Sequence, residues 1–394
     1  MKPVFYFPNL TPLRGIAALL TVVFHVGLMG GNLANHTNLL NRMYLMVDFF
    51  FVLSGFIMCH VYGKLFSTGI SAAAFKKFAI ARFARVYPLH FITLLYTIVL
   101  FFIAARLGIP KEPVVQIENS GFSIITNLLL LHSMNFHNWF SWVHASWSIS
   151  TEWWAYMIFP FLVRPFTRLT ATGKTAIAFL CFAGYLCITF FIVPLVTIPK
   201  EIPFVKIDPA DLSINVAYQF GFLRCLCGFV LGMMMYQGFV IEWGKKILAN
   251  GYAMGIAALA LFTSMHFGLP DVISVSFLPF ILLSAAYGSK SIDKLFATKA
   301  LQRLGDWSFS IYLVHQPLMF TIGSAMSYLN LMNSNKPPAG PPPAPSMLIS
   351  WGICLVFIAI TLLVSSLMYR FWELPARRWI NQKASKNEIN FLLK

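Results

Sequence analysis

The stretch from Thr11 to His25 reads TPLRGIAALLTVVFH and places two reactive side chains in one apolar segment. Arg14 stands at its start and His25 follows eleven residues later, almost three turns of an α-helix. The two side chains would therefore share a face, roughly 16 Å apart along the axis. If this helix crosses a membrane, that face carries a cation near one surface and a titratable base deep inside. Such an imidazole could act as a general base or as a nucleophile.

Other ionisable residues also interrupt apolar segments. Asp48 follows in VDFFFVLSGF, Glu152 in the hydroxyl-rich ASWSISTEWW, and Arg224 and His315 stand mid-way along later segments. An ionisable group at the centre of a membrane helix costs about 2.5–3.5 kcal/mol, so each is a functional-site hypothesis. We expect Glu152 or Asp48 to orient the imidazole of His25. The alternative for each is a polar group that only bonds a neighbouring helix.

A cationic stretch, FKKFAIARFARVYP at residues 75–88, predicts an amphipathic helix that runs into the third apolar segment. Arg82 and Arg85 are three residues apart and so share a face. With Arg14 at the same membrane level they could form an arginine cluster, and guanidinium groups bind phosphate in a bidentate manner. The alternative is a set of ordinary cytoplasmic cations beside anionic lipid.

The amino-acid composition indicates the class of fold that holds these residues in place. The chain has 394 residues, of which 58% are hydrophobic and only 11% charged, whereas soluble domains carry about 25% charged residues. We therefore expect an all-α, polytopic integral membrane protein with about ten transmembrane helices. The predicted spans are 13–30, 44–62, 86–106, 146–163, 175–194, 213–236, 251–268, 272–288, 306–330 and 347–369.

The distribution of lysine and arginine predicts the orientation. The chain has a net charge of +16, and most of its lysine and arginine residues lie in the loops and ends on one side of the ten spans. By the positive-inside rule this is the cytoplasmic side. We expect both termini there, in the inner membrane, and no nucleic-acid partner. Residues 1–375 would form one transmembrane domain and 376–394 a short cytoplasmic tail. The outer loop 331–346 contains KPPAGPPPAP, which is typical of a stiff spacer. The six cysteines show no metal-binding spacing, so no metal is expected.

Six short motifs follow one another along nearly the whole chain. They are LRGIAA followed by His25, DFFFVLSGF from Asp48, RFAR ending at Arg85, WSISTE ending at Glu152, SFSIYLVH ending at His315, and ELP from Glu373. In this order they resemble the motifs of the acyltransferase family 3 membrane proteins. One departure is Trp153 and Trp154 after Glu152, where many relatives carry a second acidic or amide residue.

The resemblance implies an O-acyltransferase that moves an acetyl or other short acyl group from cytoplasmic acyl-CoA to a sugar hydroxyl. The implied acceptor is a surface or lipid-linked glycan, such as polysaccharide, lipopolysaccharide or peptidoglycan. Catalysis is implied for His25, and donor binding for Arg14, Arg82 and Arg85. The expected partners are therefore acetyl-CoA as co-substrate, the glycan and the bilayer. Relatives often append an SGNH-hydrolase-like domain, which we expect to be absent because the chain ends soon after the tenth span.

Two other classes of function compete with an enzyme. A transporter or flippase for a glycan or lipid-linked sugar would also carry ionisable groups at mid-membrane. It predicts inverted repeats and broken helices in matching halves, and the sequence shows neither. A non-catalytic membrane sensor predicts a soluble output domain, but the longest polar stretch is under forty residues. The sequence therefore favours the enzyme.

Overall fold

The computed structural model describes residues 7–29, 37–202, 208–333 and 346–392. Within these ranges all regular structure is helical and no strand occurs, which confirms the predicted all-α class. The predicted proline-rich spacer lies outside the described residues. The helices of eight residues or more are α1 (Leu10–Met29), α3 (Met46–Phe66), α4 (Ala72–Arg106), α6 (Gly121–Leu128), α7 (Trp147–Arg168), α8 (Ala171–Cys187), α9 (Gly221–Val240), α11 (Gly251–His266), α12 (Asp271–Tyr287), α14 (Lys299–Asp306), α15 (Ser308–Asn333), α16 (Met347–Met368) and α17 (Leu374–Leu392).

Shorter elements connect these helices. They are α2 (Asn38–Asn41), η1 (Met43–Leu45), α5 (Pro113–Gln116), η2 (His144–Ser146), η3 (Ile188–Ile192), η4 (Val193–Leu195), η5 (Pro209–Asp211), α10 (Lys245–Leu248), α13 (Lys290–Phe296) and η6 (Tyr369–Glu373).

The count of ten spans is not confirmed. Each predicted span contains a helix, but only six segments of the described residues are long and apolar enough to cross a membrane. A seventh is possible if α12 and α13, bent by 92°, count as one span. The helices α11 and α12 have only 16 and 17 residues, whereas α7 and α15 are long enough but carry many polar side chains.

Large apolar side chains cover much of the outer surface. Phe179, Ile256 and Leu348 are 71%, 68% and 84% exposed, and each lies on an apolar helix. Exposure of this kind is unfavourable in water but expected where a helix faces lipid. The chain is therefore a multi-pass membrane protein.

The predicted cytoplasmic helix and the third span form one continuous helix, α4. Its 35 residues would extend about 52 Å at 1.5 Å per residue, well beyond a hydrocarbon core of about 30 Å. The side chain of Ser71 caps the helix by accepting a hydrogen bond from the backbone N–H of Ala74. This extension carries Arg82 and Arg85 on a rigid support.

Two glycines allow α3 and α9 to pack closely. A Cβ atom added to Gly55 would lie 1.8 Å from the carbonyl oxygen of Phe229, and one added to Gly232 would lie 1.9 Å from that of Val52. The two backbones are thus in direct contact at the Ser-Gly pair of DFFFVLSGF. Small residues serve this purpose at helix crossings in membranes.

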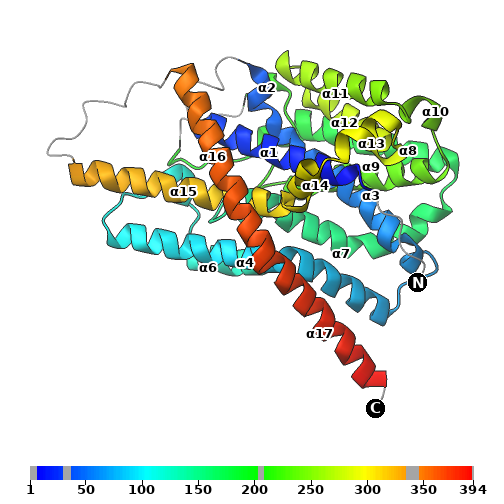
Figure 1. The fold of residues 1–394 in the computed structure, drawn as a ribbon, viewed down its shortest axis with the longest axis horizontal. Coiled ribbons are helices and arrows are strands. Elements are labelled where there is room, and N and C mark those ends of the chain that lie inside the picture. Colours follow the sequence, from blue (N-terminus) through cyan, green and yellow to red (C-terminus); the bar gives the residue numbers. More distant parts are fainter. Residues whose placement is uncertain (1–6, 30–36, 203–207, 334–345, 393–394) are drawn as a thin grey trace.

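The helix α1 packs against α14 and α15. Gly15 packs directly against the backbone of Leu304 and Gly305, where an added Cβ atom would lie 2.7 Å from backbone atoms of both residues. This contact holds Arg14 beside the start of α15. The helices α16 and α17 form one long rod that crosses the other helices diagonally (Figure 1), joined by the π-helical turn η6. Turns of this type are frequent at functional sites.

We predict that Gly55→Ala destabilises the protein by about 1–3 kcal/mol, because the added methyl group must separate α3 from α9. The matched control is Gly63→Ala on the same helix, where an added Cβ meets nothing within 4 Å. That variant should be neutral or stabilised by up to about 1 kcal/mol. Thermal unfolding in detergent measures both. Equal melting temperatures for the two variants would contradict the close contact.

Candidate active site

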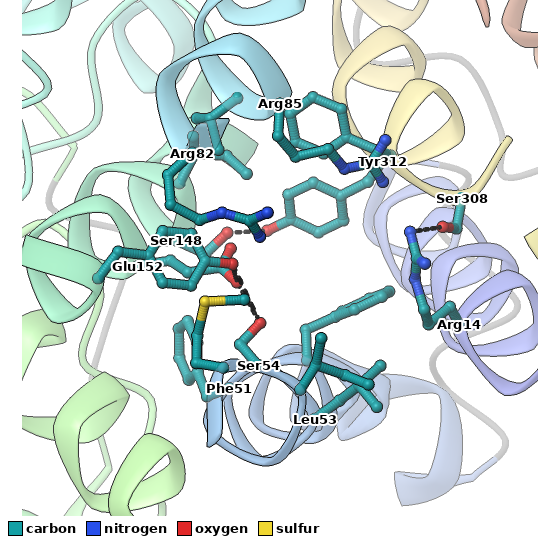
Figure 2. Close-up of a pocket in the computed structure, with 17 residues that line it drawn as sticks. Arg14, Phe51, Leu53, Ser54, Arg82, Arg85, Ser148, Glu152, Ser308 and Tyr312 are labelled. Atoms are coloured by element: carbon teal, nitrogen blue, oxygen red, sulfur yellow. Dashed lines mark hydrogen bonds between the residues drawn. The ribbon is translucent and has the colours of Figure 1, made fainter. Parts of the chain in front are cut away.

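A cavity of about 140 Å³ opens between α1, α3, α4, α7 and α15. Figure 2 shows side chains from these five helices pointing into it from different sides. Arg14, Arg82, Arg85 and Glu152 all line the cavity. Four of the six site residues predicted from the sequence therefore meet in one place.

The three arginines are held differently. Arg14 donates from Nη2 to the hydroxyl of Ser308 over 3.2 Å, as drawn in Figure 2. Arg82 donates from Nη2 to the hydroxyl of Tyr62 over 2.9 Å. Its buried Nε has no hydrogen-bond partner within the described residues. A buried donor without a partner is costly, so an anionic acceptor placed beside this Nε would stabilise the guanidinium group.

Arg85 forms an ion pair with Glu373 on η6. The second oxygen of this carboxylate accepts a hydrogen bond from Ser310 over 2.7 Å, and Glu373 is only 2% exposed. In the sequence, Glu373 is recognisable only as part of the ELP motif, and its ion pair with Arg85 is not evident. No local pattern could have predicted it, because the two partners lie 288 residues apart.

Glu152 lines the same cavity as the three arginines. Its Oε1 accepts hydrogen bonds from the hydroxyls of Ser54 on α3 and Tyr156 on α7. Tyr156 was missed from the sequence, although a spacing of four residues places it on the same helix face as Glu152. Glu152 makes no hydrogen bond to His25 in the described structure, so it does not hold the imidazole as we had expected.

Asp48 lies away from the cavity in a buried ion pair with Arg224. Both side chains are fully buried, and Nε and Nη2 of Arg224 lie 3.0 and 2.6 Å from the two carboxylate oxygens. The structure thus does not bring Asp48 to His25. The physical reason is that a buried guanidinium group needs a counter-ion far more than a neutral imidazole does.

His25 contacts a second histidine instead of a carboxylate. Its Nδ1 lies 2.9 Å from the carbonyl oxygen of Thr21 and 3.2 Å from Nε2 of His315. Nδ1 of His315 lies 3.2 Å from the carbonyl oxygen of Ile311. His315 is fully buried, whereas His25 is partly exposed. In the sequence, His315 is recognisable as an ionisable residue mid-way along an apolar segment, but its contact with His25 is not evident.

Tyr312 separates the cavity from the histidine pair. It lines the cavity, and its ring lies edge-on to that of His315 with 6.1 Å between the centroids. Ser308, Tyr312 and His315 follow at i, i+4 and i+7, so they share one face of α15. Since Arg14 contacts Ser308 and His25 contacts His315, the helices α1 and α15 run in the same direction.

Among the described residues, no group of three or more His, Cys, Asp or Glu side chains is placed to hold a metal ion. The chemical groups that the site does present are guanidinium groups, hydroxyls, one carboxylate and two imidazoles. Such a set can bind an anion and transfer a proton at nearby positions.

Most of the relatives to which this chain is similar are named as acyltransferases. The acyltransferase MdmB of Streptomyces mycarofaciens is 25% identical over 78% of this chain and 78% of its own length. Protein 2 in the picA locus of Rhizobium radiobacter is 32% identical over 37% of this chain and 76% of its own length. The peptidoglycan O-acetyltransferase OatA of Listeria monocytogenes is 22% identical over 98% of this chain, which spans 59% of that protein's length.

No solved structure matches the chain. A family described as an acyltransferase domain matches residues 8–370 and therefore nearly all of the described helices. The match covers both the arginine cavity and the histidine pair. The chain thus belongs to acyltransferase family 3, and it is an acyltransferase of the membrane.

Proposed function

We propose that this protein transfers an acetyl or other short acyl group from cytoplasmic acyl-CoA to a sugar hydroxyl of a cell-surface or lipid-linked glycan. It would do so in the inner membrane, with both termini in the cytoplasm. The observation that carries the proposal is the placement of three arginines around a cavity that ends one helical turn from the His25–His315 pair.

The cavity suits the donor in two respects. Arg14, Arg82 and Arg85 would hold the phosphate groups of CoA, since arginine matches phosphate in both charge and geometry. Apolar and aromatic side chains such as Phe50 and Phe309 form other parts of the wall, and these suit the long, mostly uncharged pantetheine arm. The roughly 16 Å from Arg14 to His25 along α1 is about the reach of such an arm.

His25 would serve as the general base. It takes the proton from the acceptor hydroxyl, whose oxygen then attacks the thioester carbonyl. The carbon–sulfur bond breaks, and the CoA thiolate leaves and takes up a proton. A positioned base of this kind contributes roughly 10²–10⁴-fold to the rate. In a stepwise alternative, His25 would itself carry the acyl group between donor and acceptor.

The acceptor is proposed from the relatives. OatA of Listeria monocytogenes is named as a peptidoglycan O-acetyltransferase, which supports a glycan acceptor for this chain as well. Asp48 would contribute indirectly, by holding α3 and Ser54 in place through its ion pair with Arg224. Glu152 would act on the donor within the cavity.

We predict that deletion of the gene removes acetyl esters from one surface glycan, and that wild-type protein but not His25→Ala restores them. His25 acts mainly in the transition state, so purified His25→Ala should show a strongly reduced kcat with nearly normal CoA binding by calorimetry. An unchanged ester content in every surface glycan would contradict the proposed acceptor. Retained transfer by His25→Ala would exclude His25 as the base.

The paired change Arg82→Lys and Arg85→Lys is expected to raise the KM for acyl-CoA several-fold, because lysine keeps the charge but loses the bidentate geometry. Arg14→Ala should likewise act chiefly on this KM. The control is the pair Arg164→Lys and Arg168→Lys, two exposed arginines at the end of α7 that lie outside the cavity. If both double variants show the same KM, the cavity arginines are only topology signals.

Glu152→Gln is expected to lower kcat while leaving the melting temperature nearly unchanged. Glutamine can still accept the hydrogen bonds of Ser54 and Tyr156, but it removes the negative charge from the cavity. Glu242→Gln, at an exposed side chain on the surface, is the control for loss of a carboxylate. Normal transfer by a well-expressed Glu152→Gln would assign this residue a structural role only.

A further inference from the structure

The contact between His25 and His315 determines which nitrogen of each ring carries hydrogen. A carbonyl oxygen only accepts hydrogen bonds, and Nδ1 of both rings faces one, at Thr21 and Ile311. Each neutral ring therefore carries its hydrogen on Nδ1. Nε2 of His315 is then an acceptor, and it receives the Nδ1–H of His25 over 3.2 Å. The reverse assignment would direct two lone pairs at two carbonyl oxygens.

We propose that His315 is a positioning residue, which holds the ring of His25 so that Nε2 of His25 is the reactive nitrogen. This proposal rests on the role of His25 in the proposed function. The carbonyl oxygen of Thr21 also accepts the backbone N–H of His25 within α1, so it is a shared acceptor. Nε2 of His315 is not shared in this way, and it comes from a different helix.

The surroundings of the two rings assign their roles. Both nitrogens of His315 are engaged, and its side chain is fully buried. His25 is partly exposed, and its Nε2 makes no hydrogen bond within the described part of the chain. Of the four ring nitrogens, Nε2 of His25 is therefore the one that can take up or release a proton without breaking a hydrogen bond of the described structure.

His315 is well placed to hold another ring still, because α15 is anchored on both sides of it. The hydroxyls of Tyr312 and Ser148 form a hydrogen bond of 2.7 Å. The side-chain oxygen of Gln316 accepts a hydrogen bond from the backbone N–H of Ala145 over 2.5 Å. Both partners belong to the start of α7 and the turn before it. A supporting residue that is itself fixed keeps a reactive group within the narrow geometry that catalysis needs.

The role of the partner differs from that of a carboxylate. When His25 takes a proton on Nε2, its Nδ1–H remains bonded to a neutral imidazole rather than to a negative charge. The pair therefore stabilises the orientation of the imidazolium more than its charge. His315 consequently does not need a counter-ion in the membrane interior, where an unpaired charge is expensive.

The test combines kinetics with a direct measurement of the tautomer. Nitrogen-15 NMR of histidine-labelled full-length protein in nanodiscs, with His25→Ala to assign the signals, reports which nitrogen is protonated. In the wild type we expect His25 to be protonated on Nδ1 and not on Nε2. In His315→Leu only the shared carbonyl oxygen of Thr21 still accepts the Nδ1–H of His25. We therefore expect a fraction protonated on Nε2 to appear beside the Nδ1–H tautomer, and a kcat lowered by about tenfold or more, part of what a positioned base contributes.

His315→Gln supplies an amide oxygen that can accept the Nδ1–H of His25, so it should restore the single tautomer and much of kcat. The matched control is His90→Leu. His90 is another fully buried histidine, and it bonds the carbonyl oxygen of Asn127, away from the pair. This variant should lose stability but keep the tautomer of His25.

Three outcomes would overturn the proposal. One is an unchanged tautomer and kcat in His315→Leu, and another is a wild-type His25 protonated on Nε2. The third is complete loss of transfer in His315→Leu with an unaltered His25 tautomer, which would make His315 itself the catalyst. Failure of the proposed function is distinguishable, because retained transfer by His25→Ala leaves the tautomer measurement valid.

Discussion

The contact between α3 and α9 is the constraint on which the site depends. Gly55 and Gly232 allow the two backbones to touch, and the Asp48–Arg224 ion pair joins the same helices. Removing one partner of a buried ion pair costs about 3–5 kcal/mol, because the other charge is left without compensation. The helix α3 also supplies Phe50, Leu53 and Ser54 to the cavity wall. The position of this wall is thus set by a contact outside the cavity.

A second constraint is the face of α15 that carries Ser308, Tyr312 and His315. This face contacts Arg14 at one end and His25 at the other, so one helix aligns both parts of the site along α1. Ser310 on the same helix bonds Glu373, which in turn holds Arg85. The arginine cavity and the histidine pair are therefore built from shared elements, and a shift of α15 would disturb both.

The proposed acyl transfer from an anionic donor needs one site for the charge of the donor and another for proton transfer. A compact site would place the phosphate charges beside the base. In this protein α1 separates Arg14 from His25 by about 16 Å, and the aromatic ring of Tyr312 lies between the cavity and His315. In the proposed reaction, this separation would let guanidinium groups bind the charged part of the donor near one end while proton transfer takes place at the imidazoles in the interior.

The local features of this protein could be predicted from its sequence alone. Composition indicated a helical membrane protein, and the helical period placed Arg14 with His25, and Arg82 with Arg85, on common faces. Only the tertiary structure decided the partners: Asp48 with Arg224, Glu373 with Arg85, and His315 with His25. These pairs lie 176, 288 and 290 residues apart, and helix packing alone brings them together. The number of spans could not be read from apolar length for a related reason. The helices α7 and α15 carry polar residues that face the interior of the protein, and these make both helices less apolar than the helices that face lipid.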